Sequence, residues 1–232
     1  MVTLLTLTLF IALLPFIGLW LLSIKLEDAS IIDIYWGPSF AVTALAAILV
    51  SSLVHGTIDP VAQLTAALTI LWGARLGLYL FRRNHGHGED WRYQKMRAAR
   101  GERFVVWSLY GVFGLQWFVM AIVSLPVTIT ILGGGSGNKM TNLGVLVYLT
   151  GFLFEAVGDA QLAKFKSDPA NAGKVMNKGL WAWTRHPNYF GNAALWWGLG
   201  LIATSAGHGW TLIGPAVMTY FLINISGKAM LE

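Results

Sequence analysis

The chain has 232 residues, of which 56% are hydrophobic and only 12% are charged, and its formal net charge is +5. With a mean hydropathy of +0.61, this composition excludes an ordinary soluble domain and indicates an integral membrane protein in contact with lipid. The lack of cysteine excludes disulfides and thiolate chemistry. In a membrane protein the excess positive charge is typical of cytoplasmic loops, so we expect no nucleic acid partner.

Seven apolar segments are long enough to cross the roughly 30 Å of hydrocarbon in a bilayer, which takes about 20 helical residues. They cover residues 2–24, 37–54, 61–81, 104–132, 142–163, 188–206 and 210–226. The first is too long for the apolar core of a signal peptide and has no basic flank before it, so we expect a retained spanning helix. The sequence therefore predicts an all-α bundle of seven transmembrane helices in a single integral membrane domain, residues 1–232.

Basic residues gather in the loops on one side of this predicted bundle. Lys25, residues 82–103, residues 164–185 and Lys228 follow the first, third, fifth and seventh spans, whereas the opposite loops contain one lysine, Lys139. Positively charged loops remain in the cytoplasm, so the N-terminus is predicted outside and the C-terminus inside. Within the second basic segment, His85 and His87 lack carboxylate or cysteine partners at ligand spacing, so we predict a flexible loop and no metal site.

A polar stretch, Gly-Leu-Trp-Ala-Trp-Thr-Arg-His-Pro-Asn-Tyr-Phe-Gly-Asn at residues 179–192, precedes the sixth span. Pro187 suits the first turn of a helix, which we expect to run to Ser205. Arg185 and His186 then lie beside unpaired backbone N–H groups and the positive end of the helix dipole, which together favour a phosphate or carboxylate. The alternative is a membrane-interface turn in which the arginine reaches the lipid headgroups.

Charged side chains inside apolar spans are costly, by at least about 2.5 kcal/mol each, and so each needs a reason. Glu155, Asp159 and Lys166 fall within about 40° on one helix face, because they are spaced i, i+4 and i+11. Either Asp159 pairs with a cation of a neighbouring helix, or this face lines a ligand site. Arg75, Tyr79 and Arg82, spaced i, i+4 and i+7, form a second polar stripe on the third span. Asp33 is either a helix-capping carboxylate or a functional group.

These residues resemble a known family. The run from Asp159 to Asn171, followed by Gly179-Leu-Trp and Arg185-His-Pro-Asn-Tyr-Phe-Gly191, is similar to the C-terminal signature of the steroid 5-alpha-reductase superfamily, and nearest to its bacterial branch of unknown function. Sterol C14 reductases and the lamin B receptor have a similar block, and isoprenylcysteine carboxyl methyltransferases have a shorter version. The resemblance is specific over residues 151–232 and weaker before them.

The resemblance implies a seven-helix enzyme of the bacterial inner membrane that binds NADPH at the cytoplasmic face. It implies reduction of a carbon–carbon double bond in a lipophilic substrate of the steroid, isoprenoid or enone kind. The implied cofactor-binding residues are Arg82, Glu155, Asp159, Lys166, Arg185, His186, Asn188, Tyr189 and Asn192. Tyr79 is the implied catalytic hydrogen-bond donor, because it aligns with the tyrosine that the steroid reductases place beside the substrate carbonyl.

The sequence departs from the family pattern at several positions. The steroid enzymes have an asparagine at the position of Glu155 and usually an acid at that of Asn192. Trp36 stands where they place a glutamate that holds the substrate carbonyl, and we predict that Asp33, one turn earlier, takes that catalytic role as the partner of Tyr79. Relatives continue past the position of Glu232 into a short basic tail that closes the cofactor pocket, so we expect weaker cofactor affinity in a chain that ends there.

Two other functions stay open at this point. The first is an S-adenosylmethionine-dependent membrane methyltransferase of the isoprenylcysteine type, and the second is a non-catalytic lipid-binding membrane protein. The basic residues of the chain favour NADPH, because its three phosphate groups need several convergent cations. S-adenosylmethionine has no phosphate group and does not need them.

Overall fold

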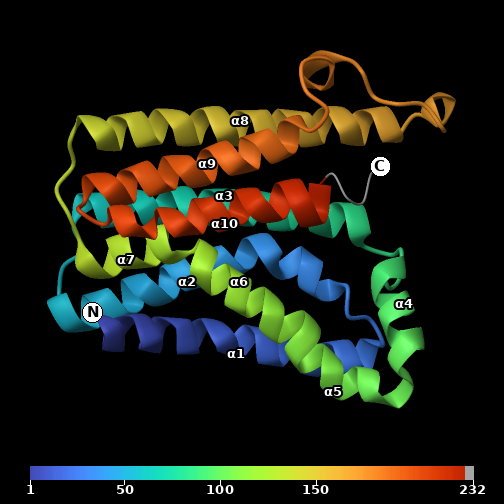
Figure 1. Ribbon diagram of the computed structural model, residues 1–232, viewed down its shortest axis with the longest axis horizontal. Helices are drawn as coiled ribbons and strands as arrows, with labels where there is room; N and C mark the ends of the chain where they lie inside the picture. Colours follow the sequence, from blue (N-terminus) through green and yellow to red (C-terminus); the bar gives the residue numbers. More distant parts are fainter. Residues whose placement is uncertain (228–232) are drawn as a thin grey trace. The chain divides into compact units, whose positions relative to one another are not determined.

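The computed structural model describes residues 1–227, and within them the chain forms helices and turns and no strand (Figure 1). Lys228 and Glu232 lie outside the described residues. Contacts within the chain divide it into two compact units, unit 1 at residues 1–135 and unit 2 at residues 136–232. The organisation as one integral domain stays a prediction.

Unit 1 is built from helices that follow one another with short connections. They are α1 (Val2–Leu26), α2 (Ile31–His55), α3 (Pro60–Asn84), α4 (Trp91–Arg100), the 3-10 turn η1 (Gly101–Arg103), α5 (Phe104–Ser108), the π-helix η2 (Leu109–Gly114), α6 (Leu115–Val123) and α7 (Leu125–Gly133).

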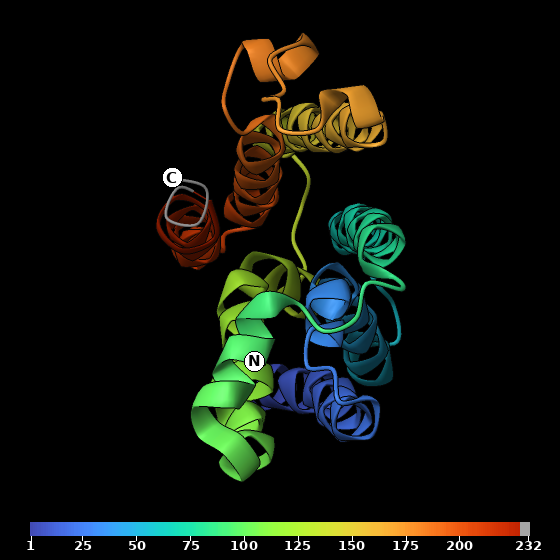
Figure 2. The same cartoon turned by 90° about the vertical axis from the view of Figure 1, so that its right-hand side faces the viewer.

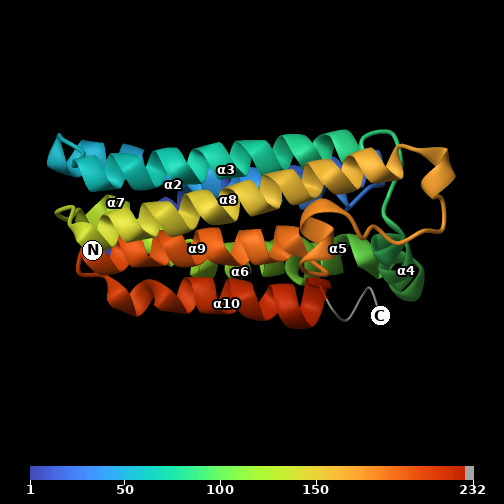
Figure 3. The same cartoon turned by 90° about the horizontal axis from the view of Figure 1, so that it is seen from above.

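Unit 2 is a long helical hairpin followed by a shorter helix. Its elements are α8 (Lys139–Lys166), the 3-10 turns η3 (Pro169–Asn171) and η4 (Gly179–Ala182), α9 (Pro187–Ser205), the 3-10 turn η5 (Gly209–Leu212), α10 (Ile213–Phe221) and the π-helix η6 (Leu222–Gly227). Figures 2 and 3 show α9 between α8 and α10, and α9 contacts both of them.

Within the described residues, five helical segments are long and apolar enough to cross a membrane: Val2–Leu26, Ile31–His55, Pro60–Asn84, Trp91–Val123 and Lys139–Lys166. A shorter apolar segment follows at Gly209–Ile225. The composition and these helices identify a helical membrane protein. The count of seven spans and the orientation of the termini stay predictions.

Three boundaries differ from those expected from the sequence. The second helix begins at Ile31 and continues through Pro38, whose ring packs on Gly77 of α3, so the proline is accommodated inside the helix. The fourth segment is not one continuous helix, because α6 ends at Val123 and α7 begins beyond Ser124, with Pro126 in its first turn. The polar segment at residues 82–103 contains the unexpected helix α4.

Helices α2 and α3 pack closely in unit 1 and bring two candidate residues to the same end of the pair. A Cβ at Gly37 would lie 2.8 Å from the backbone oxygen of Gly73, so only glycine permits this approach. The same register sets Pro38 against Gly77. Because the helices are antiparallel, Asp33 in the first turn of α2 and Tyr79 near the end of α3 lie at one end of the pair.

Candidate functional site

Glycines spaced seven residues apart allow α8 and α9 to approach each other closely. They are Gly144, Gly151 and Gly158 in α8, and Gly191 and Gly198 in α9. A Cβ at Gly191 would lie 2.5 Å from the backbone oxygen of Gly151, and a Cβ at Gly198 would lie 2.6 Å from that of Gly144. Seven residues are close to two helical turns, so small residues at this spacing form a continuous seam between the helices.

Two carboxyl groups of α8 are buried in this seam and paired with amides of α9. Glu155 is 3% exposed and accepts a hydrogen bond from Asn192 Nδ2 at 3.2 Å. Asp159 is 4% exposed and accepts one from Asn188 Nδ2, also at 3.2 Å. The two acids are four residues apart, and so are the two amides, so the antiparallel helices align both pairs. A buried carboxyl is tolerated only where donors of this kind replace water.

The expected helix start at Pro187 is confirmed, because α9 covers Pro187–Ser205 with His186 as its N-cap. The His186 ring stacks on that of Tyr189, with the ring centres 5.3 Å apart. The Asn188 side chain accepts a hydrogen bond from the Tyr189 backbone N–H at 3.1 Å. Arg185 is exposed immediately before the helix. The start of α9, which we call its mouth, thus places the cation of Arg185 and the imidazole of His186 at the positive end of the helix dipole.

A turn at residues 179–181 folds back onto α8 beside the Asp159–Asn188 pair. The indole N–H of Trp181 donates to the backbone oxygen of Gly158 at 3.0 Å, and the backbone N–H of Leu180 donates to Gln161 Oε1 at 3.0 Å. These contacts fix the polar segment over the seam.

One acceptor at this seam has no protein partner. Asn192 is 7% exposed, and its Oδ1 atom is buried with no hydrogen bond among the described residues. Orphaned buried acceptors are uncommon and call for an explanation such as a ligand donor. Lys166, the other predicted cofactor contact in this unit, is exposed at the end of α8. The seam thus combines buried acceptors with basic groups at its polar end.

The remaining predicted residues belong to unit 1. Tyr79 and Arg82 are in the last two turns of α3, where Arg82 is exposed and Tyr79 is half-buried. The Arg83 guanidinium lies over the Tyr79 ring, 5.9 Å from its centre. Arg83 and Tyr79 are therefore placed as a cation–π pair.

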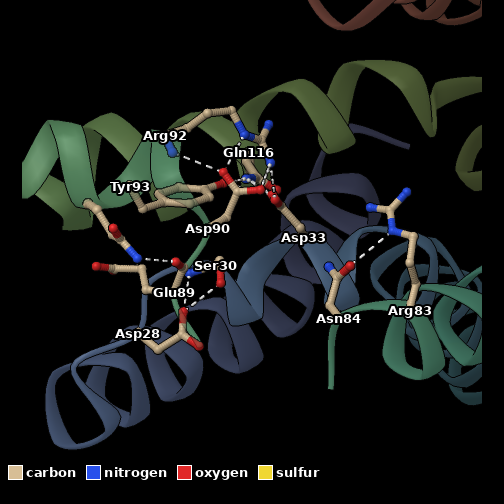
Figure 4. Close-up of polar contacts among 11 residues, drawn as sticks. Asp28, Ser30, Asp33, Arg83, Asn84, Glu89, Asp90, Arg92, Tyr93 and Gln116 are labelled. Carbon is tan, nitrogen blue, oxygen red and sulfur yellow. Dashed lines mark hydrogen bonds and ion pairs between the residues drawn. The ribbon is translucent and has the colours of Figure 1, made fainter. Parts of the chain in front are cut away.

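Asp33 is the centre of a polar cluster that joins α2, α4 and α6 (Figure 4). Its carboxylate accepts hydrogen bonds from Arg92 Nη2 and from the Tyr93 hydroxyl, both at 2.7 Å. Gln116 Nε2 lies 3.5 Å from the same carboxylate and 3.4 Å from the Tyr93 hydroxyl. The pairing of Asp33 with Tyr79 stays a prediction. The structure shows a different phenol, that of the buried Tyr93, hydrogen-bonded to Asp33.

Two further acids of the 82–103 segment position α4. Asp90 caps the helix by accepting from the Arg92 backbone N–H at 3.0 Å, and the hydrogen bond from the Arg92 side chain holds the pKa of the Asp90 carboxyl below its usual range. Glu89 accepts from the Ala29 backbone N–H at 2.8 Å and from Arg97, also at 2.8 Å. A capping aspartate before ten residues free of glycine and proline was the available sequence signal for this helix.

The candidate residues therefore fall into two groups. Unit 2 brings together Glu155, Asp159, Asn188, Asn192, Tyr189 and the mouth residues Arg185 and His186, whereas unit 1 contains Asp33, Tyr79 and Arg82. A single site that uses both groups stays a prediction.

A helical membrane protein with two buried carboxyl–amide pairs is the class that the fold and site define. The chain belongs to the family described as "Protein of unknown function (DUF1295)", which matches residues 19–232. This family is related to steroid 5-alpha-reductase-like proteins, so the resemblance is confirmed at the level of that family.

Two curated proteins are similar to the chain. The "Probable O-methyltransferase ustE" of Ustilaginoidea virens is 31% identical over 93 residues, covering 40% of this chain and 31% of that protein. The "Uncharacterized protein C594.04c" of Schizosaccharomyces pombe is 23% identical over 223 residues, covering 84% of this chain and 64% of that protein. The chain thus spans less than two thirds of the length of either relative. No solved structure matches it.

Proposed function

We propose that the protein is an NADPH-dependent membrane reductase of a carbon–carbon double bond in a lipophilic substrate. The observation that carries the proposal is the pair of buried carboxyl–amide contacts, Glu155 with Asn192 and Asp159 with Asn188, next to the basic mouth of α9. We place this site at the cytoplasmic face of a bacterial inner membrane.

The donor and acceptor set fits a dinucleotide with a phosphorylated ribose. Buried carboxylates accept hydrogen bonds from ribose hydroxyls, and the orphaned Asn192 Oδ1 accepts one from a hydroxyl or a carboxamide N–H. Residues 164–186 contain five lysines and arginines and one acid, which suits phosphate groups. When bound, NADPH would supply the hydride, and Lys166, Arg185 and His186 would hold its phosphates.

The chain itself would bind the substrate and stabilise charge on its electron-withdrawing oxygen. A neutral phenol donates a hydrogen bond at physiological pH, and a donor aimed at a developing negative charge lowers the barrier. Tyr79 is the proposed donor, and Asp33 its proposed partner. Trp36, at the place of the family's glutamate, removes any implication of a 3-oxo-steroid substrate.

A second candidate function has its own support. The match to a protein named as a probable O-methyltransferase favours a methyltransferase that uses S-adenosylmethionine. The buried acids Glu155 and Asp159 also suit its sulfonium and ammonium charges, because opposite charges attract strongly where water is excluded. The basic segment at residues 164–186 favours the phosphates of NADPH instead.

Isothermal titration calorimetry of the full chain in detergent separates these functions. We expect NADPH to bind more tightly than NADH, because the basic segment engages the additional 2′-phosphate. Equal affinity for both, or binding of S-adenosylmethionine alone, would overturn the reductase proposal. Binding of none of the three compounds would favour the non-catalytic lipid-binding alternative.

Substitutions in the seam test the site itself. Asp159→Ala and Asn188→Ala should each abolish NADPH binding while the protein stays monodisperse. Asp168→Ala is the control, because it changes an exposed acid in the segment at residues 164–186 and should leave NADPH binding unchanged. If the Asp159–Asn188 pair only holds the helices together, Asp159→Ala will lower the melting temperature and leave the affinity unchanged.

A further inference from the structure

Two arginines of α4 stack on two aromatic rings of α5, across the turn that joins these helices. The Arg97 guanidinium carbon lies 4.5 Å from the ring centre of Phe104, and that of Arg100 lies 3.5 Å from the ring centre of Trp107. The Trp107 ring is itself held against the following turn, because a Cβ at Gly111 would lie 2.6 Å from its Cε2 atom. Stacking fixes the plane of each guanidinium and lowers the entropy that it loses on binding a ligand.

The three arginines of α4 differ in the number of ion pairs that they form. Arg92 forms ion pairs with Asp33 and Asp90, and Arg97 forms one with Glu89. Within residues 1–227, Arg100 donates only to a backbone oxygen, that of Met96 at 3.3 Å.

Neither Arg100 nor Arg103 has a carboxylate within 4 Å among the residues that the structure describes, although the exposed Glu102 lies between them in sequence. Arg103 is four residues before Trp107, a spacing that sets two helical side chains on the same face. Two guanidinium groups without acidic partners among the described residues are therefore three residues apart at this turn, and that of Arg100 stacks on the Trp107 indole ring.

The sequence indicates that the turn between α4 and α5 lies where a polar segment meets an apolar, lipid-facing segment. From Phe104 to Leu115 the chain has no charged residue, and it enters this apolar run directly after Arg103. Val106 is 62% exposed and Tyr110 is 70% exposed along the same run, as expected for side chains that face lipid. Figures 1 and 2 show α4 lying across the ends of the unit 1 helices, so it would run along the surface of a membrane that those helices cross.

We propose that Arg100, Arg103 and Trp107 form a binding site for the phosphate of an anionic phospholipid headgroup, with Val106 and Tyr110 against its acyl chains. Planar guanidinium groups bind phosphate through two parallel hydrogen bonds, which an ammonium group cannot form. An aromatic ring beside basic residues is typical of the headgroup level of a bilayer.

Native mass spectrometry of the full chain in detergent, titrated with phosphatidylglycerol, tests the site. We expect the affinity to fall about fivefold for Arg100→Gln or Arg103→Gln and about 25-fold for the double variant. Lys95→Gln is the matched control, because it removes an exposed cation of α4 that is not part of the proposed site and should change nothing. Arg100→Lys keeps the charge and loses the planar fork, so it should weaken binding by less than Arg100→Gln.

Several results would overturn the proposal. They are undiminished phosphatidylglycerol binding by the double variant, an equal loss in Lys95→Gln, and equal affinity for phosphatidylcholine with the same acyl chains. Displacement of the lipid by millimolar inorganic phosphate would instead assign the site to a free anion. If the double variant does not fold, the two single variants and Arg100→Lys decide the question with the same titration.

Discussion

Replacing Gly191 by alanine tests the seam that brings the carboxyl and amide groups together. The new Cβ would lie 2.5 Å from the backbone oxygen of Gly151, and closer still to the backbone nitrogen of Glu155. Ordinary contacts of this kind are no shorter than about 3.4 Å, and both neighbours are helix backbone, so α8 and α9 must separate locally by about 1 Å. The 3.2 Å hydrogen bond from Asn192 to Glu155 then exceeds hydrogen-bonding distance.

The magnitude follows from these two effects. Overpacking costs about 1–3 kcal/mol, and loss of a hydrogen bond to a buried charged group costs about 1.5–3 kcal/mol. A destabilisation of about 3 kcal/mol lowers the melting temperature of a protein of this size by about 6–12 °C. The assay is thermal unfolding in detergent, with NADPH affinity measured on the same samples and expected to fall.

Gly18→Ala is the matched control for this substitution. Gly18 lies inside α1, and a Cβ there would meet nothing within 4 Å. Because glycine is less favourable than alanine inside a helix by about 1 kcal/mol, this variant should keep or raise the melting temperature. An unchanged melting temperature in Gly191→Ala would refute the reasoning, since it would mean that the helices are not held at this distance.

Three other substitutions have defined outcomes. Tyr79→Phe should leave NADPH affinity intact and lower turnover of an enone or enal lipid about 10²-fold, and unimpaired turnover would remove Tyr79 from the mechanism. Asp33→Asn should accelerate amide hydrogen exchange in α4 about tenfold, because its Arg92 and Tyr93 contacts lose a charged acceptor; unchanged exchange would show that these contacts do not hold α4. The lowered pKa of Asp90 contributes stability that is complete above its ordinary value of 3.8 and is lost as the pH falls through the folded-state value. Melting temperatures below about pH 4 should therefore fall less in Asp90→Asn than in the unmodified protein, and parallel curves would contradict this account.

The long helices could be predicted from the sequence because a bilayer fixes their length. Helix α1 ends within two residues of its expected end, and α9 begins where Pro187 predicts. The break at Ser124 was not predicted, because the apolar composition continues through it and only Pro126 signals a new first turn. Helix α4 was missed since its arginines resemble a loop that satisfies the positive-inside rule, whereas three carboxylates hold Arg92 and Arg97 in a folded helix.

The candidate site was predictable only as far as one helix allows. Helical spacing predicts that Glu155 and Asp159 share a face, and the structure confirms this. Their amide partners depend on the register between α8 and α9. Glycines set this register, and because glycine has no functional side chain they did not mark the site in the sequence. The contacts of Asp33 likewise come from Tyr93, 60 residues later, and no local pattern predicts a contact at that distance.

The Glu155–Asn192 pair also explains two departures from the family pattern together. The resemblance implies an asparagine at the first position and an acid at the second, and this chain has the reverse. Because the two side chains face each other at 3.2 Å across a buried seam, exchanging them retains one carboxyl and one amide. Two carboxyls at this distance would repel each other in the absence of water, so the two positions are expected to change together.

A double-mutant cycle tests this exchange. Asn192→Glu alone should destabilise the protein by about 3–5 kcal/mol, because it buries a second carboxyl without a donor. Glu155→Asn alone should cost less, since two amides can still form a hydrogen bond. The double variant Glu155→Asn with Asn192→Glu should regain about 1–3 kcal/mol of the summed loss in thermal unfolding, which is the coupling energy of side chains in contact. If the two costs simply add, the side chains act independently and the exchange has no structural basis.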